Sequence, residues 1–180
     1  MTFARYSLPM RSLLVVLLAS IFPCTLLAEK VTFAKERFSI DIPKTWKKGD
    51  GPDDGSLVYR DAPDGEGSFS VYQLPVAKDH KADLKGTLNS RVEAIKKAGL
   101  KVSAEVKAHE QPNFDGKPAV FGVVPIEAKH QDQVVKFTYY LVFIDCKDSV
   151  VILQAALPRP LTPELQQDAL GIIQSFREKE

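Results

Sequence analysis

The sequence predicts an α+β domain with one antiparallel sheet of about six or seven strands and helices packed on its faces. Three observations predict this. Several short segments alternate apolar and polar residues, as half-buried strands do. Most of the segments are joined by short runs rich in Gly, Pro and Asp, which suits antiparallel pairing. Two further segments, one in the middle and one at the C-terminus, carry apolar residues at helical spacing.

Residues 38–46, FSIDIPKTW, form the stretch around which the rest is organised. Phe38, Ile40 and Ile42 alternate with polar residues, which is typical of a strand with one face on a core, and the proline that follows ends the strand. Trp46 is the only Trp in the chain. We expect it to close the open end of the core, and the alternative is that it stacks on a ligand in a pocket beside it.

The other strands follow from alternation, or from apolar runs bounded by turn formers. Residues 137–144 and 150–153 are largely apolar on both alternating sets, which indicates strands covered on both faces at the centre of the sheet. A turn is expected over residues 112–118, PNFDGKP. The predicted strands span residues 31–33, 38–42, 56–60, 68–74, 102–108, 119–129, 134–145 and 149–157.

Two helices are expected. Asp83 is a suitable N-cap for the first, and Gly99 ends it. Thr162 and Pro163 open the second in the order N-cap then N1. Their apolar stripes are, respectively, Leu84, Leu88, Val92 and Ile95, and Leu165, Ala169, Ile172, Ile173 and Phe176.

The N-terminal segment has the features of a secretory signal. Two arginines precede a short apolar run over residues 13–21, and a cleavage site after Ala28 is plausible. We therefore expect a signal peptide over residues 1–28, a single domain over 29–180, and a location in the bacterial periplasm or outside the cell. An uncleaved membrane anchor is the alternative. A lipid anchor at Cys24 is disfavoured because Phe and Pro, and no small residues, precede it.

Composition excludes some partners. The chain has 24 Lys and Arg against 23 Asp and Glu, with no basic stripe, so we expect no nucleic-acid partner. If the signal peptide is removed, Cys146 is the only cysteine left and can form no internal disulfide. Stability must then come from packing.

The order of motifs resembles the PsbP-like superfamily, which includes PsbP of photosystem II, DcrB-like lipoproteins and the nuclear-transport factor Mog. The resemblance rests on F-x-I-x-I-P-x-x-W, read here as FSIDIPKTW, then a hairpin, the helix LKGTLNSRVEAIKKAG, DGKPAVFG before three strands, and the final PELQQDALGIIQSFR. It covers nearly the whole chain after the signal. It implies an α/β/α sandwich on a largely antiparallel sheet, and proteins that act mostly by binding other proteins.

No catalytic constellation is evident. His80, His109 and His130 have no metal-binding spacing, and Cys146 has no activating motif around it, so His109, His130 and Cys146 indicate a hydrolase only if folding brings them together. Nucleotide- and dinucleotide-binding motifs do not occur, so no cofactor is expected.

Two groups of side chains remain as binding candidates. The acids Asp50, Asp53, Asp54 and Asp61 match a calcium loop poorly, and a solvated turn is the simpler interpretation. Tyr139 and Tyr140 are expected to be core or core-edge aromatics, with a partner-binding patch as the second choice.

The sequence therefore predicts a non-enzymatic, exported binding or accessory protein. Its expected partner is another protein of the cell envelope, and contact with a membrane is expected only through an uncleaved signal or a lipid anchor. The alternatives are a small-ligand or metal-binding periplasmic protein, or the hydrolase described above.

Overall fold

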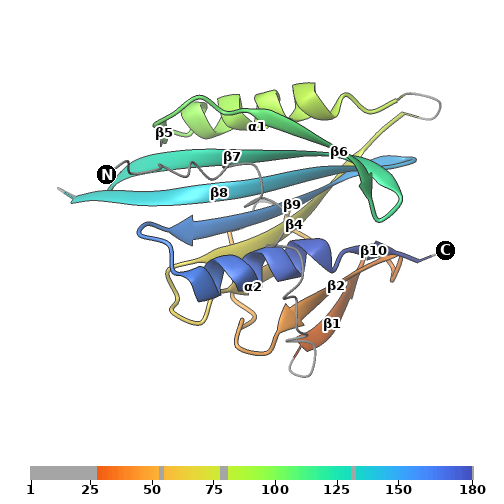
Figure 1. Ribbon diagram of the computed structural model, residues 1–180, viewed down its shortest axis with the longest axis horizontal. Helices are drawn as coiled ribbons and strands as arrows, with labels where there is room; N and C mark the ends of the chain where they lie inside the picture. Colours follow the sequence, from red (N-terminus) through yellow and green to blue (C-terminus); the bar gives the residue numbers. More distant parts are fainter. Residues whose placement is uncertain (1–27, 53–54, 78–80, 131–132, 180) are drawn as a thin grey trace, which may run out of the picture.

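Strands make up about half of the part of the chain that the structure describes, and two helices accompany them (Figure 1). The computed structural model describes residues 28–52, 55–77, 81–130 and 133–179. In this part of the chain the elements are β1 (Ala28–Phe33), β2 (Phe38–Pro43), β3 (Val58–Asp61), β4 (Ser68–Pro75), α1 (Leu84–Lys97), β5 (Lys101–Val102), β6 (Ala108–Phe114), β7 (Lys117–His130), β8 (Gln133–Cys146), β9 (Ser149–Pro158), α2 (Pro163–Gln174) and β10 (Arg177–Glu178).

These strands form two antiparallel sheets. The large sheet has seven strands in the order β3-β4-β9-β8-β7-β5, with β6 also paired to β7. The small sheet has three strands in the order β1-β2-β10. The sequence predicts the large sheet correctly as antiparallel, but it places FSIDIP in the same sheet. In the structure this segment is β2, which pairs with β1 along its whole length and with β10 at Phe38 and Ser39, and it belongs to the small sheet.

The two faces of the large sheet are covered differently. Helix α1 lies on one face, where its buried side chains join a core with residues of β7, β8 and β9. Helix α2 and the small sheet together cover the other face, and their side chains form the larger core with β4, β8 and β9 (Figure 1). The result is the α/β/α layering that the resemblance implies, with a small sheet added beside α2.

The centre of the large sheet agrees with the sequence pattern over most of its length. Residues 141–144 of β8 and 150–153 of β9 are buried on both alternating sets. The start of β8 differs, because residues 133–136 are exposed. Strand β9 ends at Pro158, opposite Phe137, so β8 and β7 continue beyond it as a projecting hairpin (Figure 1). The connecting residues 131–132 lie outside the described residues.

The predicted strand over residues 102–108 is wrong, despite its clean alternation. Five residues, 103–107, stand opposite only three of β7, because Val102 pairs with Ile126 and Ala108 with Gly122. Pro125 lies in that gap and has no N–H, so the edge strand bulges away at this point. The predicted turn at 112–118 is also narrower than expected: β6 runs to Phe114, and only Asp115 and Gly116 turn.

Both helices begin as predicted, and α1 also ends as predicted. Helix α2 ends at Gln174, so Phe176, which the sequence places in its apolar stripe, is buried just beyond the helix. The Asp83 side chain accepts a hydrogen bond from the Gly86 N–H (2.9 Å), and Gly99 after α1 has φ of +83°. Thr162 Oγ1 accepts a hydrogen bond from the Leu165 N–H (3.3 Å) at the start of α2. In the described ranges, no helix combines the length and apolar character needed to cross a bilayer.

Candidate functional site

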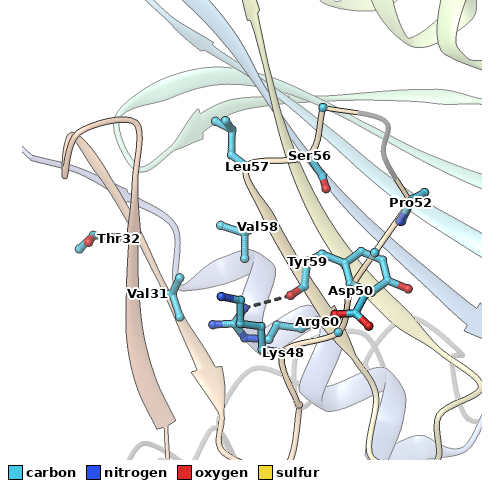
Figure 2. A pocket seen from close by; sticks show the side chains of 13 residues that line it. Val31, Thr32, Lys48, Asp50, Pro52, Ser56, Leu57, Val58, Tyr59 and Arg60 are labelled. Atoms are coloured by element: carbon cyan, nitrogen blue, oxygen red, sulfur yellow. Dashed lines mark hydrogen bonds between the residues drawn. The ribbon is translucent and has the colours of Figure 1, made fainter.

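An open groove separates the edges of the two sheets. It lies between β1 of the small sheet and β3 of the large sheet, and we call it the β1–β3 groove (Figure 2). Its volume is about 640 Å³. It is lined by Val31, Thr32, residues 48–52 and residues 55–60.

The wall formed by β1 presents backbone groups to this groove. Just before β2, the Arg37 C=O accepts a hydrogen bond from the Lys179 N–H (2.7 Å), and on β2 the Asp41 N–H donates to Ser175 Oγ (2.7 Å). The odd-numbered backbone groups of this segment therefore point away from β1. Backbone groups alternate in direction along an antiparallel strand. The even-numbered groups of β2 therefore bond to β1, and on β1 the N–H and C=O of Lys30 and Thr32 point outward. Among the described residues, no strand pairs with this outer edge.

The wall formed by β3 is different, because the chain covers part of it. Lys47 and Asp61 exchange two backbone hydrogen bonds across this edge, of 3.0 and 2.8 Å. The Tyr59 C=O accepts a hydrogen bond from Arg60 Nη1 (2.9 Å). The loop that follows Lys47 lies close to β3, and a side chain at Gly51 would meet the Tyr59 ring. Glycine at this position therefore lets the loop form one wall of the groove.

Charge in the groove is unevenly balanced. Lys48 and Arg60 extend into the space between β1 and β3, and Asp50 is the one acidic side chain among the lining residues that the structure describes (Figure 2). Neither cation forms an ion pair with another described residue. Within the described residues, the groove therefore combines a strand edge that pairs with no other strand and two cations that form no ion pair.

Trp46 lies just before the groove and contributes to the core. Its side chain is 3% exposed, and its indole N–H donates to Asp168 Oδ2 of α2 at 3.2 Å. As placed here, the ring joins the end of β2 to α2 and offers almost no surface on which a ligand could stack. The chain that follows it lines the groove with residues 48–52 and 55–60.

The two predicted tyrosines point to opposite faces of β8. Tyr139 makes an edge-to-face contact with Phe137 (5.2 Å between ring centroids), and Tyr140 stacks on Phe121 (6.2 Å). Burial raises the pKa of Tyr140, against the opposing effect of Arg159. Strands β9 and β4 separate β8 from β3, so both tyrosines are about 14 Å or more from the β1–β3 groove.

The acidic residues do not assemble a metal site in the part of the chain that the structure describes. Asp50 lines the groove and is exposed, whereas Asp61 is held by its backbone pairing to Lys47. Asp53 and Asp54 lie outside the described residues. No group of three or more His, Cys, Asp or Glu residues at metal-binding distance occurs within those described.

The histidines and Cys146 are also far apart. His109 is opposite Phe121, which is opposite Val142, so strand geometry places His109 about 16 Å from Cys146. His130 is at the other end of β7, about 40 Å from Cys146 along the hairpin. His80 lies outside the described residues. Burial raises the pKa of the Cys146 thiol to about 12, which opposes a nucleophilic role. The structure does not bring these three residues together.

A second charged region, which the sequence does not reveal, joins three hairpin tips to the C-terminal strand. We call it the hairpin-tip cluster; it consists of Arg37, Asp115, Lys117, Asp148, Arg177 and Glu178. The Arg37 guanidinium donates to Glu178 Oε1 (2.7 Å), Asp148 Oδ1 (2.6 Å) and the Cys146 C=O (2.9 Å). Lys117 Nζ lies 3.0 Å from Glu178 Oε2.

The hairpin-tip cluster holds unusual backbone in place. In the described chain, the non-glycine residues with positive φ are Ala34, Lys35, Glu36, Asp115 and Lys147, all of them in these three tips. Left-handed backbone costs roughly 1–2 kcal/mol for a residue with a side chain. Hydrogen bonds from Arg37 to β8 and β10 offset that cost. Because its ionic groups satisfy one another, the cluster is a structural junction.

Comparison with known proteins finds the fold and no close relative. No family model matches the sequence, and no curated protein does. The solution structure of cyanobacterial PsbP (CyanoP) from Synechocystis sp. PCC 6803 is similar, with a TM-score of 0.60 and 11% identity over 90% of this chain and 99% of that one. A crystal structure from Bacteroides thetaiotaomicron has a TM-score of 0.60 and 12% identity over 86% of this chain. The chain spans about half, 49%, of that protein. The chain thus has a PsbP-like fold.

Proposed function

We propose that this protein is a non-enzymatic accessory protein that is exported and acts by binding another protein through the β1–β3 groove. The observation that carries the proposal is the groove itself. It presents the outer edge of β1 and two cations that have no ion-pair partner among the described residues. Strand edges of this kind form main-chain hydrogen bonds with partner proteins.

Two further observations support a binding role. The fold is that of PsbP, and the resemblance of the sequence to PsbP-like proteins implies action through protein contacts. The residues that a hydrolase would need are too far apart for a direct contact: Cys146 is buried, and it lies about 16 Å from His109 and about 40 Å from His130. The proposal of export rests on the signal-like pattern over residues 1–28, which lies almost wholly outside the described part of the chain.

A small ligand is the second candidate for the same groove. Its volume of about 640 Å³ is in the range of small-molecule sites, which supports this alternative. Such sites usually enclose most of the ligand between apolar walls. The β1–β3 groove is open to solvent and lined largely by polar atoms, which favours a protein partner.

Affinity capture tests the protein-binding role. The full chain with a C-terminal tag is expressed in the source organism, cross-linked in place and recovered. We expect one partner in stoichiometric amount, and its loss when the groove charges are inverted by Lys48→Glu together with Arg60→Glu. Lys107→Glu is the control, because Lys107 is exposed between β5 and β6 and lines no part of the groove.

Two results would contradict the proposal. One is recovery of the bare protein from cells under every cross-linking condition. The other is a partner that the Lys48→Glu, Arg60→Glu double variant captures as well as the Lys107→Glu control does. Fractionation of the same cells tests export separately: the chain is expected in the periplasmic or extracellular fraction, and a wholly cytoplasmic chain would refute that part.

A further inference from the structure

We infer that the partner inserts an extended acidic segment into the β1–β3 groove, where it pairs with β1 as a fourth strand of the small sheet. This inference rests on the proposed function and specifies how the partner is recognised. It is carried by the direction of the β1 backbone groups, the blocked edge of β3 and the charge of the groove.

The outer edge of β1 is suited to strand addition. The N–H and C=O groups of Lys30 and Thr32 point outward, two residues apart, as in a strand that awaits a neighbour. The six residues of β1 pair with β2 in unbroken register, without a bulge or a proline. An added strand would therefore meet a regular template.

Four other edge strands of the two sheets are protected, namely β3, β5, β6 and β10. On β3, Lys47 occupies the position opposite Asp61. Strand β6 has a register shift between Gln111 and Phe114 and contains a proline, and β5 and β10 are two residues long. Bulges, prolines and short lengths are the usual devices that prevent pairing at an edge. Within the described residues, β1 alone combines length, regular register and an adjoining groove.

The groove also selects the chemistry of the segment. Lys48 and Arg60 extend toward the position that an added strand would occupy, whereas Asp50 is the one carboxylate among the described residues of the lining (Figure 2). Val31 and Val58 contribute apolar side chains to the same groove. Since side chains of a strand alternate between two sides, the segment should alternate acidic residues with apolar ones.

The length of β1 sets the length of the contact. Its six residues pair with β2 in register, so an added strand can pair along β1 over no more than about six residues. A short peptide is therefore a sufficient probe. Main-chain hydrogen bonds supply affinity in this mode, so the probe does not need the natural sequence.

The test uses three fluorescent peptides of seven residues and the full chain. One alternates glutamate with valine, the second alternates lysine with valine, and the third is the acidic peptide with proline at its central position. We expect the acidic peptide to bind at least tenfold more tightly than either of the others in fluorescence anisotropy. Equal binding of the basic peptide, or no binding of the acidic peptide at millimolar concentration, would overturn the inference.

Substitutions at the β1 edge test the pairing itself. Thr32→Pro removes an outward N–H while leaving the hydrogen bonds to β2 in place, and Thr32→Ala is the matched control. We expect Thr32→Pro to weaken the acidic peptide at least tenfold and Thr32→Ala to change binding less than twofold. If Thr32→Pro does not fold, amide hydrogen exchange in the unaltered protein is the test of pairing. Bound peptide should slow amide hydrogen exchange at Lys30 and Thr32 at least tenfold, and unchanged exchange would refute strand addition.

The same variants separate this inference from the proposed function. A Thr32→Pro chain that folds and still captures the partner in full would refute strand addition and leave protein binding intact. Loss of capture in the charge-inverted chain, with the Lys107→Glu control unaffected, supports the groove as the site. A cross-linked product of this chain with itself would mean that a second copy occupies β1, and would overturn the claim of a separate acidic partner.

Discussion

Charged side chains gather at two places beside the small sheet, and their charges are balanced at one place and not at the other. At the hairpin-tip cluster, Arg37 is matched by Asp148 and Glu178, and Glu178 by Lys117. At the β1–β3 groove, Lys48 and Arg60 have no ion-pair partner among the described residues. Charges that satisfy one another hold a fold together, whereas unmatched charges beside a free strand edge are available to a partner. Changes at the first place should therefore affect stability, and changes at the second should affect binding.

The largest stability difference is expected between two apolar residues. Phe38 is fully buried beside the rings of Phe33 and Phe176, with the Arg37 guanidinium over its face at 4.7 Å. Phe38→Ala should lower the free energy of unfolding by about 3–5 kcal/mol in chemical denaturation. Leu57, in the groove, is 45% exposed. Leu57→Ala should change the free energy of unfolding by no more than about 0.5 kcal/mol. If Phe38→Ala and Leu57→Ala lowered the free energy of unfolding equally, the groove would be as important for stability as the core beside the hairpin-tip cluster.

Two arginines give the next comparison. Arg37→Met leaves Glu178 and the Cys146 C=O without their donor, and should cost about 1–2 kcal/mol because the site is partly solvated. The stability of Arg37→Lys should lie between those of the unaltered protein and Arg37→Met, since an ammonium keeps the charge but cannot reproduce the forked contacts of the guanidinium. Arg60→Met should cost no more than about 0.5 kcal/mol. A greater loss at Arg60 would show that the groove cation is structural.

The contribution of Glu178 should depend on pH. Burial alone would raise the pKa of Glu178, but hydrogen bonds from Arg37 and Lys117 outweigh it and hold the pKa below its ordinary value. A lowered folded pKa stabilises the protein above the unfolded pKa, about 4.3, and that stabilisation is lost as pH falls through the folded value. Glu178→Gln should therefore cost about 1 kcal/mol near neutral pH, and the cost should shrink below about pH 4.3.

A double-mutant cycle is the control for this pH effect. In an Arg37→Met background, Glu178→Gln should cost less than in the unaltered protein, because one of the two hydrogen-bonded cations is already gone. The free energies come from denaturant unfolding at a series of pH values. A cost for Glu178→Gln that is independent of both pH and Arg37 would contradict the ionic account of the junction.

The smallest effect concerns the strained turn. Lys35 has φ of +56° between two other residues with positive φ. Lys35→Gly removes the steric cost but adds freedom to the unfolded chain, so a net gain of about 0.5 kcal/mol is expected in unfolding free energy. Lys48, in the groove, does not have a positive φ, so Lys48→Gly relieves no strain and should lower the unfolding free energy by about 0.5 kcal/mol. A lower unfolding free energy for Lys35→Gly would show that the Lys35 side chain makes a stabilising contact that outweighs the strain of its backbone.

The sequence predicts those elements whose signal is local. Leu84, Leu88, Val92 and Ile95 define the buried stripe of α1, and Asp83 caps it, because helical periodicity and capping depend on neighbours in the chain. The buried strands at the sheet centre were readable for a similar reason: their apolar runs are covered on both faces.

Features that depend on distant pairing are not predictable in this way. The alternation over residues 102–108 is clean, yet Pro125, on another strand, interrupts the pairing there. The membership of β2 in a small sheet depends on β10, more than 130 residues later. Neither Lys48 nor Arg60 belongs to a motif, and their role is visible only once the edges of β1 and β3 lie on either side of one groove.

Site-specific photo-cross-linking tests most directly that the β1–β3 groove faces a partner. A photoreactive phenylalanine replaces either Leu57, which lines the groove, or Leu74, which is similarly exposed (42% against 45%) but does not line it. On irradiation of living cells, the account predicts one discrete adduct with another protein from position 57 and none from position 74. Equal adducts from both positions, or an adduct from position 74 alone, would contradict it.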